Sequence, residues 1–247
     1  MRKIAVSLSK GGVGKTTTAV NLGAGLAMMG HQVLLVDTDT QGQAGSMLGL
    51  APGPGLTEFV SGDLSPQEAI VQARDRLWLL AGGDSLAGLK RVIAQQQYGG
   101  ERTLARALGS LDSQYDYVIL DSAPGWDSLS INVLFYATEV LAPVSLEVMT
   151  LQGLVQFVQR VEAIQEFHPD IQLKYVLPTF LDRRVKKSEE ILGQLRAYYG
   201  QELCEPIRYN VRLSEAPGLG RTIYEYDPTC PGAQDYQQLT ERVAQDA

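Results

Sequence analysis

The feature that most constrains this chain is a glycine- and lysine-rich segment that directly follows a short apolar run. Ile4–Leu8 is expected to form a buried strand, and Thr16–Met29 is expected to form a helix. Between them the chain reads Ser9-Lys10-Gly11-Gly12-Val13-Gly14-Lys15-Thr16-Thr17. In such a setting glycines let backbone N–H groups turn toward phosphate oxygens, and the helix N-terminus adds partial positive charge. The segment therefore predicts a phosphate-binding loop.

Residues of this loop have individual expected roles. Lys15 is expected to reach the β- and γ-phosphates of a nucleotide, and the Thr16 hydroxyl is expected to bind Mg²⁺. The standard pattern has glycine six residues before that lysine, where this chain has Ser9, and a second lysine, Lys10, follows. A lysine at the loop entrance points toward a phosphate of a partner molecule; a solvated surface lysine is the alternative. The predicted nucleotide ligands are Lys10, Gly11, Gly12, Val13, Gly14, Lys15, Thr16 and Thr17.

The rest of the chain alternates apolar runs with helical stretches. The predicted strands are Ile4–Leu8, Val33–Val36, Leu77–Leu80, Tyr117–Leu120, Val140–Val144 and Leu173–Leu177. The predicted helices are Thr16–Met29, Thr103–Leu111, Thr150–Phe167, Lys187–Tyr199 and Ala233–Val243. Strands that are apolar almost throughout are buried on both faces, as in a parallel sheet covered by helices. Residues 1–247 are therefore predicted to form a single α/β P-loop NTPase domain, with a twisted, mostly parallel sheet and helices on both faces. The Gly/Pro-rich segment Leu50–Leu56 is expected to be a surface loop within it.

Composition excludes several classes of protein. Two cysteines, Cys204 and Cys230, are too few for a protein-bound iron–sulfur cluster, and two histidines are too few for a His-rich metal site. Every apolar run is much shorter than the ~20 residues that cross a bilayer. The net charge of −7 gives no overall basic footprint for nucleic acid. Any binding to DNA must therefore come from a local patch.

Aspartates end two of the predicted strands. Asp121 follows Tyr117–Leu120, which places its carboxylate at the carboxyl edge of the sheet, where it can hold a Mg²⁺-bound water. Asp37 follows Val33–Val36. It either caps the next turn or joins the Mg²⁺ shell, and these two roles are compatible. The predicted metal site thus comprises Thr16, Asp37 and Asp121.

The run KGGVGKTT resembles the deviant Walker A motif of the ParA/MinD family of ATPases. Asp37-Thr38-Asp39-Thr40-Gln41-Gly42-Gln43-Ala44 is similar to that family's D-x-D-P-Q-G-N-A, with Thr40 in place of proline and Gln43 in place of asparagine. Asp121-Ser122-Ala123-Pro124 is similar to its D-x-x-P segment. The resemblance implies ATP and Mg²⁺ as ligands and an ATP-dependent homodimer, in which Lys10 crosses to the other subunit's nucleotide. It also implies that Asp39 positions the attacking water, so the expected catalytic residues are Lys10, Lys15 and Asp39.

The carboxyl-terminal half extends the resemblance to the ParA/Soj branch. Residues 177–184, LPTFLDRR, are similar to its T-x-x-D-x-R stretch, and residues 206–217, PIRYNVRLSEAP, are similar to its I-P-R-N-V-R-L-S-E-A-P run. In the family these loops border the adenine, which implies that Thr179 and Pro206 contact the base. The similarity covers nearly the whole chain and includes no N-terminal helix-turn-helix domain, as in the small Soj-like members.

This resemblance implies a cytoplasmic, nucleoid-associated ATPase that binds DNA non-specifically. A ParB-like or other adaptor would stimulate hydrolysis, and the cargo would be a plasmid, a chromosome, or a protein body or organelle such as a carboxysome. The densest basic cluster is either a local DNA patch or a solvated helix start: Arg183, Arg184, Lys186 and Lys187. Glu225, Thr229 and Pro231 occupy positions where relatives are often basic.

Three other classes compete with this interpretation. A membrane-cycling ATPase like MinD ends in a basic amphipathic helix, whereas residues 240–247 here read TERVAQDA, so membrane attachment by that route is not expected. An electron-transfer ATPase needs cysteines near the nucleotide switches, and the first cysteine here is Cys204. A metabolic P-loop enzyme would need an acceptor pocket, which the sequence does not reveal.

Overall fold

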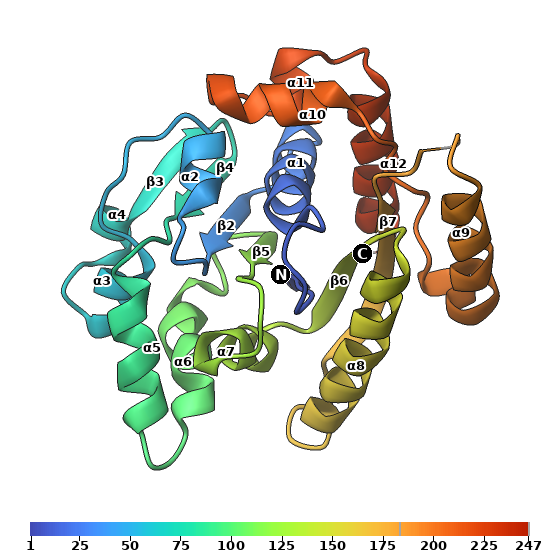
Figure 1. The fold of residues 1–247 in the computed structure, drawn as a ribbon. Coiled ribbons are helices and arrows are strands. Elements are labelled where there is room, and N and C mark those ends of the chain that lie inside the picture. Colours follow the sequence, from blue (N-terminus) through green and yellow to red (C-terminus); the bar gives the residue numbers. More distant parts are fainter. Residues whose placement is uncertain (183, 247) are drawn as a thin grey trace.

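A computed structural model describes residues 1–182 and 184–246 of the chain. Its centre is a seven-stranded sheet with helices packed on both faces (Figure 1), so the predicted fold class is confirmed. The strands are β1 (Arg2–Val6), β2 (Val33–Asp37), β3 (Ile70–Arg74), β4 (Leu77–Leu80), β5 (Tyr117–Asp121), β6 (Glu139–Ser145) and β7 (Gln172–Thr179).

The strand order brings the expected site residues to one edge of the sheet. The strands are arranged β3-β4-β2-β5-β1-β6-β7, and each neighbouring pair is parallel except β3 with β4. Because the carboxyl ends of parallel strands meet at one edge, the loops that follow β1, β2 and β5 lie together there. The register pairs Asp37 of β2 directly with Asp121 of β5.

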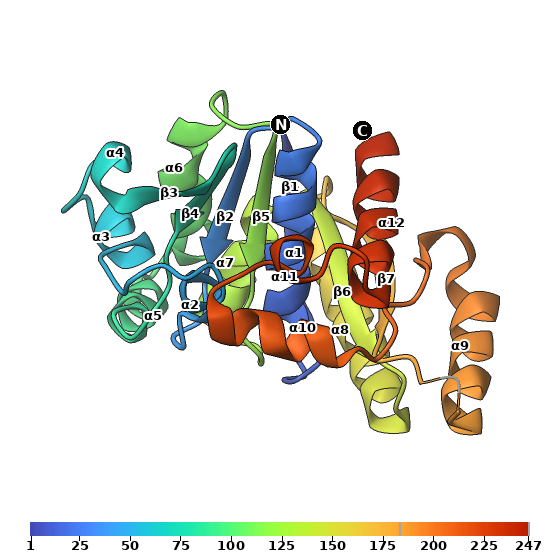
Figure 2. The same ribbon diagram turned by 90° about the horizontal axis from the view of Figure 1, so that it is seen from above.

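Two helical layers cover the sheet. Figure 2 shows α1, α11 and α12 on one face, with α5, α6, α7 and α8 on the other. No described helix is both long and apolar enough to span a membrane. The helices are α1 (Lys15–Met28), α2 (Gln43–Met47), α3 (Leu56–Ser61), α4 (Pro66–Ala69), α5 (Leu86–Gln95), α6 (Thr103–Leu108), α7 (Ser128–Tyr136), α8 (Val148–Gln165), α9 (Lys186–Tyr199), α10 (Val211–Glu215), α11 (Ile223–Tyr226) and α12 (Pro231–Gln245), with short 3-10 helices at Gly100–Arg102, Gly109–Leu111, Gly200–Glu202 and Ala216–Leu219.

The apolar core is split by the sheet into two clusters. Ile4 and Val6 belong to the cluster that includes residues of α1 and α12, whereas Ala5 belongs to the cluster under α5 to α9. Successive side chains of a strand point to opposite faces, so a strand buried on both faces has no polar positions. This is the physical reason for the continuous apolar runs in the sequence.

Several elements differ from those expected. The first strand is Arg2–Val6 rather than Ile4–Leu8, because Arg2 is paired with Tyr117 of β5 and the chain leaves the sheet after Val6. β3, α5 and α7 were not predicted, nor were the short helices α2, α3, α4, α10 and α11. β3 is an antiparallel edge strand with two exposed residues, so it lacks the continuous apolar pattern of the others. The loop at residues 50–56 is confirmed up to Gly55, and Leu56 begins α3.

Candidate nucleotide site

Glycines shape the loop between β1 and α1. Gly12 and Gly14 have φ of 73° and 87°, a left-handed conformation that other residues adopt only with strain. Gly14 is the N-cap of α1. The N–H groups of the first turn of α1 have no hydrogen-bond partner within the helix, and they lie next to this glycine. The structure thus gives the predicted phosphate-binding residues the local geometry that an anion requires.

Lys15 is buried at the start of α1. Only 7% of its surface is exposed, and its Nζ donates a hydrogen bond to the carbonyl oxygen of Lys10 at 2.8 Å. Burial lowers the pKa of Lys15, while the carboxylates of Asp121 and Asp39 oppose that shift by favouring the ammonium. The Lys10 side chain is half-buried at the loop entrance. The two lysines are therefore distinct: one faces the buried carboxylates and the other lies at the rim.

Asp121 and Asp37 form a buried acidic pair. They are register partners on adjacent strands, and both are almost completely buried. Neither carboxylate oxygen of Asp121 makes a well-formed hydrogen bond among the described residues, although the nearby Thr16 hydroxyl and the Lys15 ammonium act to lower its pKa. Burial, followed by the charge of Asp37, raises the pKa of Asp121, and burial raises that of Asp37 to about 6. An unpartnered buried carboxylate beside a second one fits a hard divalent cation such as Mg²⁺.

The Asp37 carboxylate also caps the following turn. It accepts hydrogen bonds from the backbone N–H groups of Asp39 at 2.9 Å and Ala44 at 3.1 Å. Each oxygen keeps further lone pairs, so capping leaves it able to face a cation. The capping role is present in the structure, and its role in the metal shell stays a prediction.

Asp39 lies half-buried in the turn after β2. Its Oδ1 accepts the N–H of Gln41 at 3.0 Å, and its carbonyl oxygen accepts N–H groups of Gly42 at 3.0 Å and Gly83 at 3.1 Å. A Cβ at Gly82 would lie 2.7 Å from that carbonyl oxygen. Sequence reasoning missed Gly82; the only local signal is a Gly-Gly pair directly after the β4 region.

Backbone contacts join the three loops at this edge. Gly125, after β5, donates its N–H to the carbonyl oxygen of Ser9 at 2.8 Å. The Thr38 hydroxyl donates to the carbonyl oxygen of Asp121 at 2.7 Å. Hydrogen bonds therefore join the loops that follow β1, β2 and β5.

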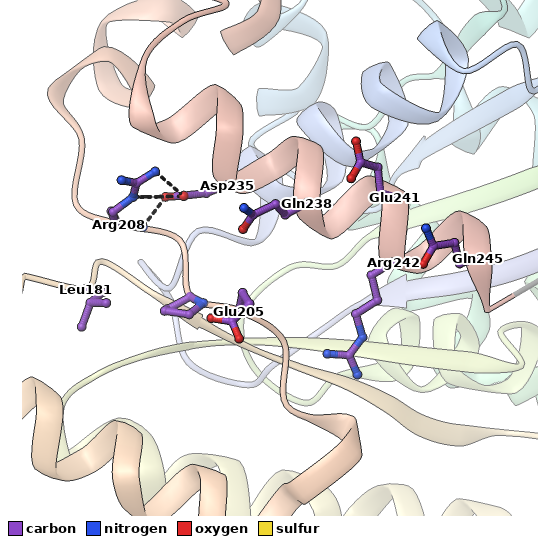
Figure 3. A pocket seen from close by; sticks show the side chains of 9 residues that line it. Leu181, Glu205, Arg208, Asp235, Gln238, Glu241, Arg242 and Gln245 are labelled. Carbon is purple, nitrogen blue, oxygen red and sulfur yellow. Dashed lines mark hydrogen bonds and ion pairs between the residues drawn. The ribbon is translucent and has the colours of Figure 1, made fainter.

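A cavity of about 600 Å³ lies beside the start of α1. Thr179 lines it, but the Thr179 hydroxyl donates to the carbonyl oxygen of Val13 at 3.0 Å and so braces the phosphate loop. Pro206 does not line this cavity; it lines a second one of about 540 Å³, with Arg208, Asp235 and Arg242 (Figure 3). The cavity beside α1 is instead lined by residues Ile207 to Asn210. Base contacts by Thr179 and Pro206 stay predictions.

The predicted basic cluster lies at the start of α9. Arg183 lies outside the described residues. Arg184 forms an ion pair with Asp182 at 2.7 Å, which holds the pKa of that carboxyl at about 2. Lys187 pairs with Glu190 at 3.1 Å, and Lys186 is exposed. Exposed pairs of this kind are weak, so both arginine and lysine can exchange their partner for a phosphate.

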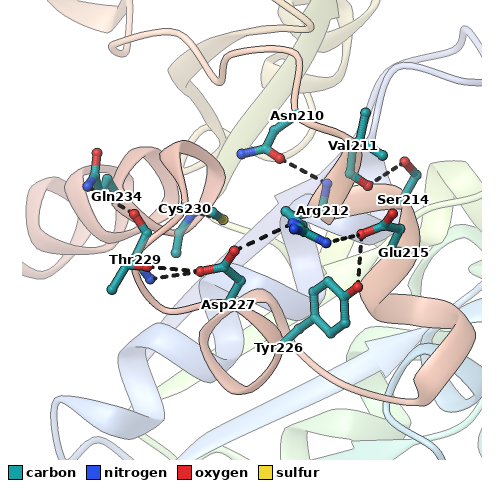
Figure 4. A network of polar contacts seen from close by, with 11 residues as sticks. Asn210, Val211, Arg212, Ser214, Glu215, Tyr226, Asp227, Thr229, Cys230 and Gln234 are labelled. Atoms are coloured by element: carbon teal, nitrogen blue, oxygen red, sulfur yellow. Dashed lines mark hydrogen bonds and ion pairs between the residues drawn. The ribbon is translucent and has the colours of Figure 1, made fainter.

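Other cations near the carboxyl end are also paired. Arg212 contacts Glu215 at 2.9 Å and Asp227 at 3.5 Å (Figure 4). Glu225 pairs with Arg74 of β3 at 2.5 Å and accepts the Thr222 N–H at 2.8 Å. The acidic residue therefore fastens α11 to the edge of the sheet. This is a structural role that the sequence did not indicate.

Comparisons with known proteins agree with this geometry. A family model described as an AAA domain matches residues 1–173. The chain is 39% identical over 245 residues to the chromosome-partitioning ATPase Soj of Thermus thermophilus, covering 98% of this chain and 95% of that protein. It is 33% identical over 251 residues to the chromosome partitioning protein ParA of Caulobacter vibrioides, covering 98% and 94%. The chain belongs to the ParA/MinD family of ATPases.

A solved structure is also similar to this ParA/MinD family member. Cobyrinic acid a,c-diamide synthase from Mycobacterium smegmatis, with bound ADP and magnesium, is 31% identical with a TM-score of 0.85. The match covers 99% of this chain and 94% of that one. A second structure of that protein holds an ATP analogue and magnesium. The nucleotide and metal present there are the ligands expected from the loop and the acidic pair described above.

The hydrogen bond from the Thr179 hydroxyl to the carbonyl oxygen of Val13 leads to a testable prediction. Thr179→Val should leave the buried carbonyl oxygen of Val13 without a donor, which costs about 1–3 kcal/mol. We expect lower stability in urea unfolding and several-fold weaker binding of both Mg-ATP and inorganic tripolyphosphate, measured by calorimetry. Thr179→Ser keeps the donor and is the matched control. Loss of ATP binding with unchanged tripolyphosphate binding would instead indicate a contact to the base.

Proposed function

We propose that this protein is a ParA-type ATPase that dimerises on ATP, binds DNA non-specifically and positions or partitions a cargo. The observation that carries the proposal is the buried Asp37–Asp121 pair, with the buried Lys15 near Asp121 and Lys10 at the rim of the same loop. Buried opposite charges at the start of a helix suit a metal-bound triphosphate better than any neutral ligand. The homology to Soj and ParA supports the same function.

Each residue of the site has a task in this proposal. Backbone N–H groups of the loop and the Lys15 ammonium hold phosphate oxygens, and Thr16, Asp37 and Asp121 would hold Mg²⁺. The metal, when bound, neutralises charge that develops on the phosphates. Asp39 orients the attacking water from the turn that its own hydrogen bonds to Gln41, Gly42 and Gly83 stabilise. The loops after β1, β2 and β5 would move together because backbone hydrogen bonds join them.

In the proposed dimer, Lys10 would contact the nucleotide that the second copy binds. The Lys15 ammonium donates to the backbone carbonyl oxygen of Lys10, and the Lys10 side chain is half-buried at the loop entrance. A cation at the rim attracts the phosphates of a nucleotide held by a second copy, and Lys10 would thereby close the dimer and stabilise charge during hydrolysis. A ParB-like or other adaptor would stimulate turnover and release the cargo.

The DNA-binding part of the proposal has its own test. With ATP, we expect the wild-type chain to dimerise in light scattering and to be retained on unrelated duplexes at low salt. Lys186→Glu with Lys187→Glu should weaken retention equally on all duplexes and leave the dimer intact. Each lost phosphate contact should reduce the log–log salt slope by about 0.9.

Glu189→Gln is a suitable control, because it changes a charge in the same first turn of α9 without removing a cation. It should not weaken retention. If the wild-type chain with ATP binds no duplex at low salt, the DNA-binding part of the proposal is wrong. Failure to form an ATP dimer would contradict the whole proposal.

A metabolic ATP-dependent enzyme is a second candidate, favoured by the similarity to the M. smegmatis synthase. Such an enzyme hydrolyses ATP in step with a small acceptor substrate. A partition ATPase hydrolyses ATP without one and responds to DNA and an adaptor protein. ATP turnover by the purified chain, with and without duplex DNA, separates the two candidates.

A further inference from the structure

Arg74, the last residue of the edge strand β3, makes a set of polar contacts that the proposed chemistry does not use. Its Nε donates to Glu225 of α11 at 2.5 Å, and its Nη2 donates to the same carboxylate at 3.2 Å. Nη2 also donates to the carbonyl oxygen of Gly220 at 2.9 Å. Nη1 donates to the carbonyl oxygens of Leu48 at 3.0 Å and Ala73 at 2.7 Å. Each N–H that a guanidinium offers therefore has a partner.

These contacts join two segments that are far apart in the sequence. Leu48 is the C-cap of α2, and Gly220 is the C-cap of the short 3-10 helix that precedes α11. A Cβ added to Gly220 would lie 2.5 Å from the Cα of Gly49, so the two backbones are in direct contact and a larger residue does not fit. Arg74 therefore fastens the end of α2 to the segment that leads into α11.

The other end of α2 contacts the buried acidic pair. Ala44, near the start of α2, donates its N–H to the carboxylate of Asp37 at 3.1 Å. Asp37 is the register partner of Asp121, and both are proposed to hold the metal. Because α2 has only five residues, little more than one helical turn separates the Asp37 carboxylate from the carbonyl oxygen of Leu48 that Arg74 holds.

The helix α11 itself lies outside the expected nucleotide cavity. No residue of Ile223–Tyr226, a segment that the structure describes throughout, lines the cavity of about 600 Å³ beside α1. The N–H of Ile223 is accepted at 2.9 Å by Oδ1 of Asn21, a buried residue of α1. Nδ2 of Asn21 donates to the carbonyl oxygen of Thr17 at 2.8 Å. Two routes therefore lead from the nucleotide site to α11, one through Asn21 and one through α2 and Arg74.

At its carboxyl end, α11 supports a second polar network. The hydroxyl of Tyr226 donates to Glu215 of α10 at 2.8 Å, and the same carboxylate pairs with Arg212 at 2.9 Å (Figure 4). The Arg212 guanidinium also lies over the ring of Tyr226, 5.9 Å from its centre. The helix α11 thus connects the end of α2 to a cation of α10.

We propose that Arg74 is a positioning residue that couples Asp37, through α2, to α11, so that binding of a magnesium nucleotide stabilises α11 in its observed position. The inference rests on the proposed function, because it requires Asp37 to face the bound metal. A guanidinium suits this role, since its planar fork contacts two carbonyl oxygens and a carboxylate in fixed directions at the same time. The nucleotide thereby acts on the network around Arg212 without touching it.

Amide hydrogen exchange of the full chain, followed by mass spectrometry on the segment Ile223–Tyr226, tests this coupling. The measured quantity is the ratio of the exchange rates without and with saturating Mg-ADP, because a contact that only stabilises the fold changes both rates and leaves their ratio unchanged. We expect a ratio of about 5 or more in wild type and about 2 or less in Arg74→Gln. Because coupling is reciprocal, the dissociation constant of Mg-ADP in calorimetry should rise by the factor by which the ratio falls. Saturating ADP with EDTA should give wild type a ratio of about 2 or less, since the route begins at the metal.

Arg76→Gln is the matched control. Arg76 lies two residues further along the chain, and its guanidinium donates to the carbonyl oxygen of Gly30 at 3.0 Å rather than to α11. The substitution removes the same charge from the same edge, so the ratio should keep its wild-type value. Glu225→Gln keeps the experiment informative if Arg74→Gln disturbs the fold, because glutamine still accepts the Thr222 N–H. It should lower the ratio by about 2-fold or more.

An unchanged ratio in both Arg74→Gln and Glu225→Gln would overturn the inference, and the contact would then only stabilise the fold. Equal protection by ADP with EDTA would also overturn it, since the effect would then reach α11 through Asn21. If calorimetry detects binding of Mg-ADP to wild type and α11 gains no protection, the inference is wrong and the proposed function stands. If the wild-type chain binds neither Mg-ADP nor Mg-ATP, the proposed function itself fails.

Discussion

Lys10→Ala should bind Mg-ATP almost as tightly as wild type and yet hydrolyse it about 100-fold more slowly or worse. Only the side chain is removed, so the carbonyl oxygen that accepts the Lys15 ammonium at 2.8 Å remains. The local phosphate loop should therefore stay intact. The lost group is a cation at the rim, and a positioned donor that stabilises developing charge is worth about 100- to 1000-fold in rate. Single-turnover hydrolysis and light scattering with ATP measure the two effects.

Lys15→Ala is the matched comparison for Lys10→Ala. Removing the buried ammonium takes away a positive charge that acts on the carboxylates of Asp121 and Asp39. We expect nucleotide affinity to fall by about 30-fold or more, because a buried charge contact is lost. The two variants should thus separate binding from turnover. Hydrolysis at the wild-type rate in Lys10→Ala would show that Lys10 is a surface lysine without a role in the partner's site.

Asp39→Ala should accumulate as a stable ATP-bound dimer that turns over about 100-fold more slowly than wild type. The variant removes the carboxylate that is proposed to orient the water, and a group in that role contributes about 100- to 10,000-fold in rate. Nucleotide binding should persist, because Lys15, Thr16 and Asp121 are unchanged. The expected result is an ATP-dependent dimer in light scattering that does not decay over many wild-type turnover times.

Asp39→Asn is the control for the structural part of this role. Asparagine keeps an oxygen that can accept the Gln41 N–H, now at 3.0 Å from Oδ1, so the turn after β2 should be preserved. If charge is what orients the water, Asn and Ala should trap the dimer equally. If Asp39→Ala stays monomeric at saturating ATP while Asp39→Asn dimerises, Asp39 acts by holding the turn rather than by positioning water.

Much of the site was predictable because its signals are local. The glycines that need positive φ, the two lysines and the strand–loop–helix order all lie within Ile4–Met28. Asp37 and Asp121 were recognisable because each ends an apolar run. Thr179 lines the cavity and its hydroxyl donates to the carbonyl oxygen of Val13, so the base contact that the resemblance implies for it stays a prediction.

Other features were not predictable, since they depend on which segments become neighbours. Gly82 looks like an ordinary turn glycine until the chain brings it against the Asp39 carbonyl oxygen. Glu225 suggested a weakened DNA surface, and only the structure shows Arg74 beside it. Phe180 and Tyr209 are exposed and line the cavity beside α1, and no sequence pattern indicated this, because a cavity wall is built from single residues of separate loops.

The α/β class followed from the sequence alone, and the phosphate loop and the acidic residues could be predicted from it, because backbone freedom and apolar periodicity are properties of short segments. Only the three-dimensional arrangement shows that Asp37 and Asp121 are register partners, that Pro206 lines a different cavity from Thr179, and that Arg184 and Arg212 pair with carboxylates. The physical reason is that pairing across strands and between loops depends on strand order, and strand order follows from the packing of the whole chain rather than from any one segment.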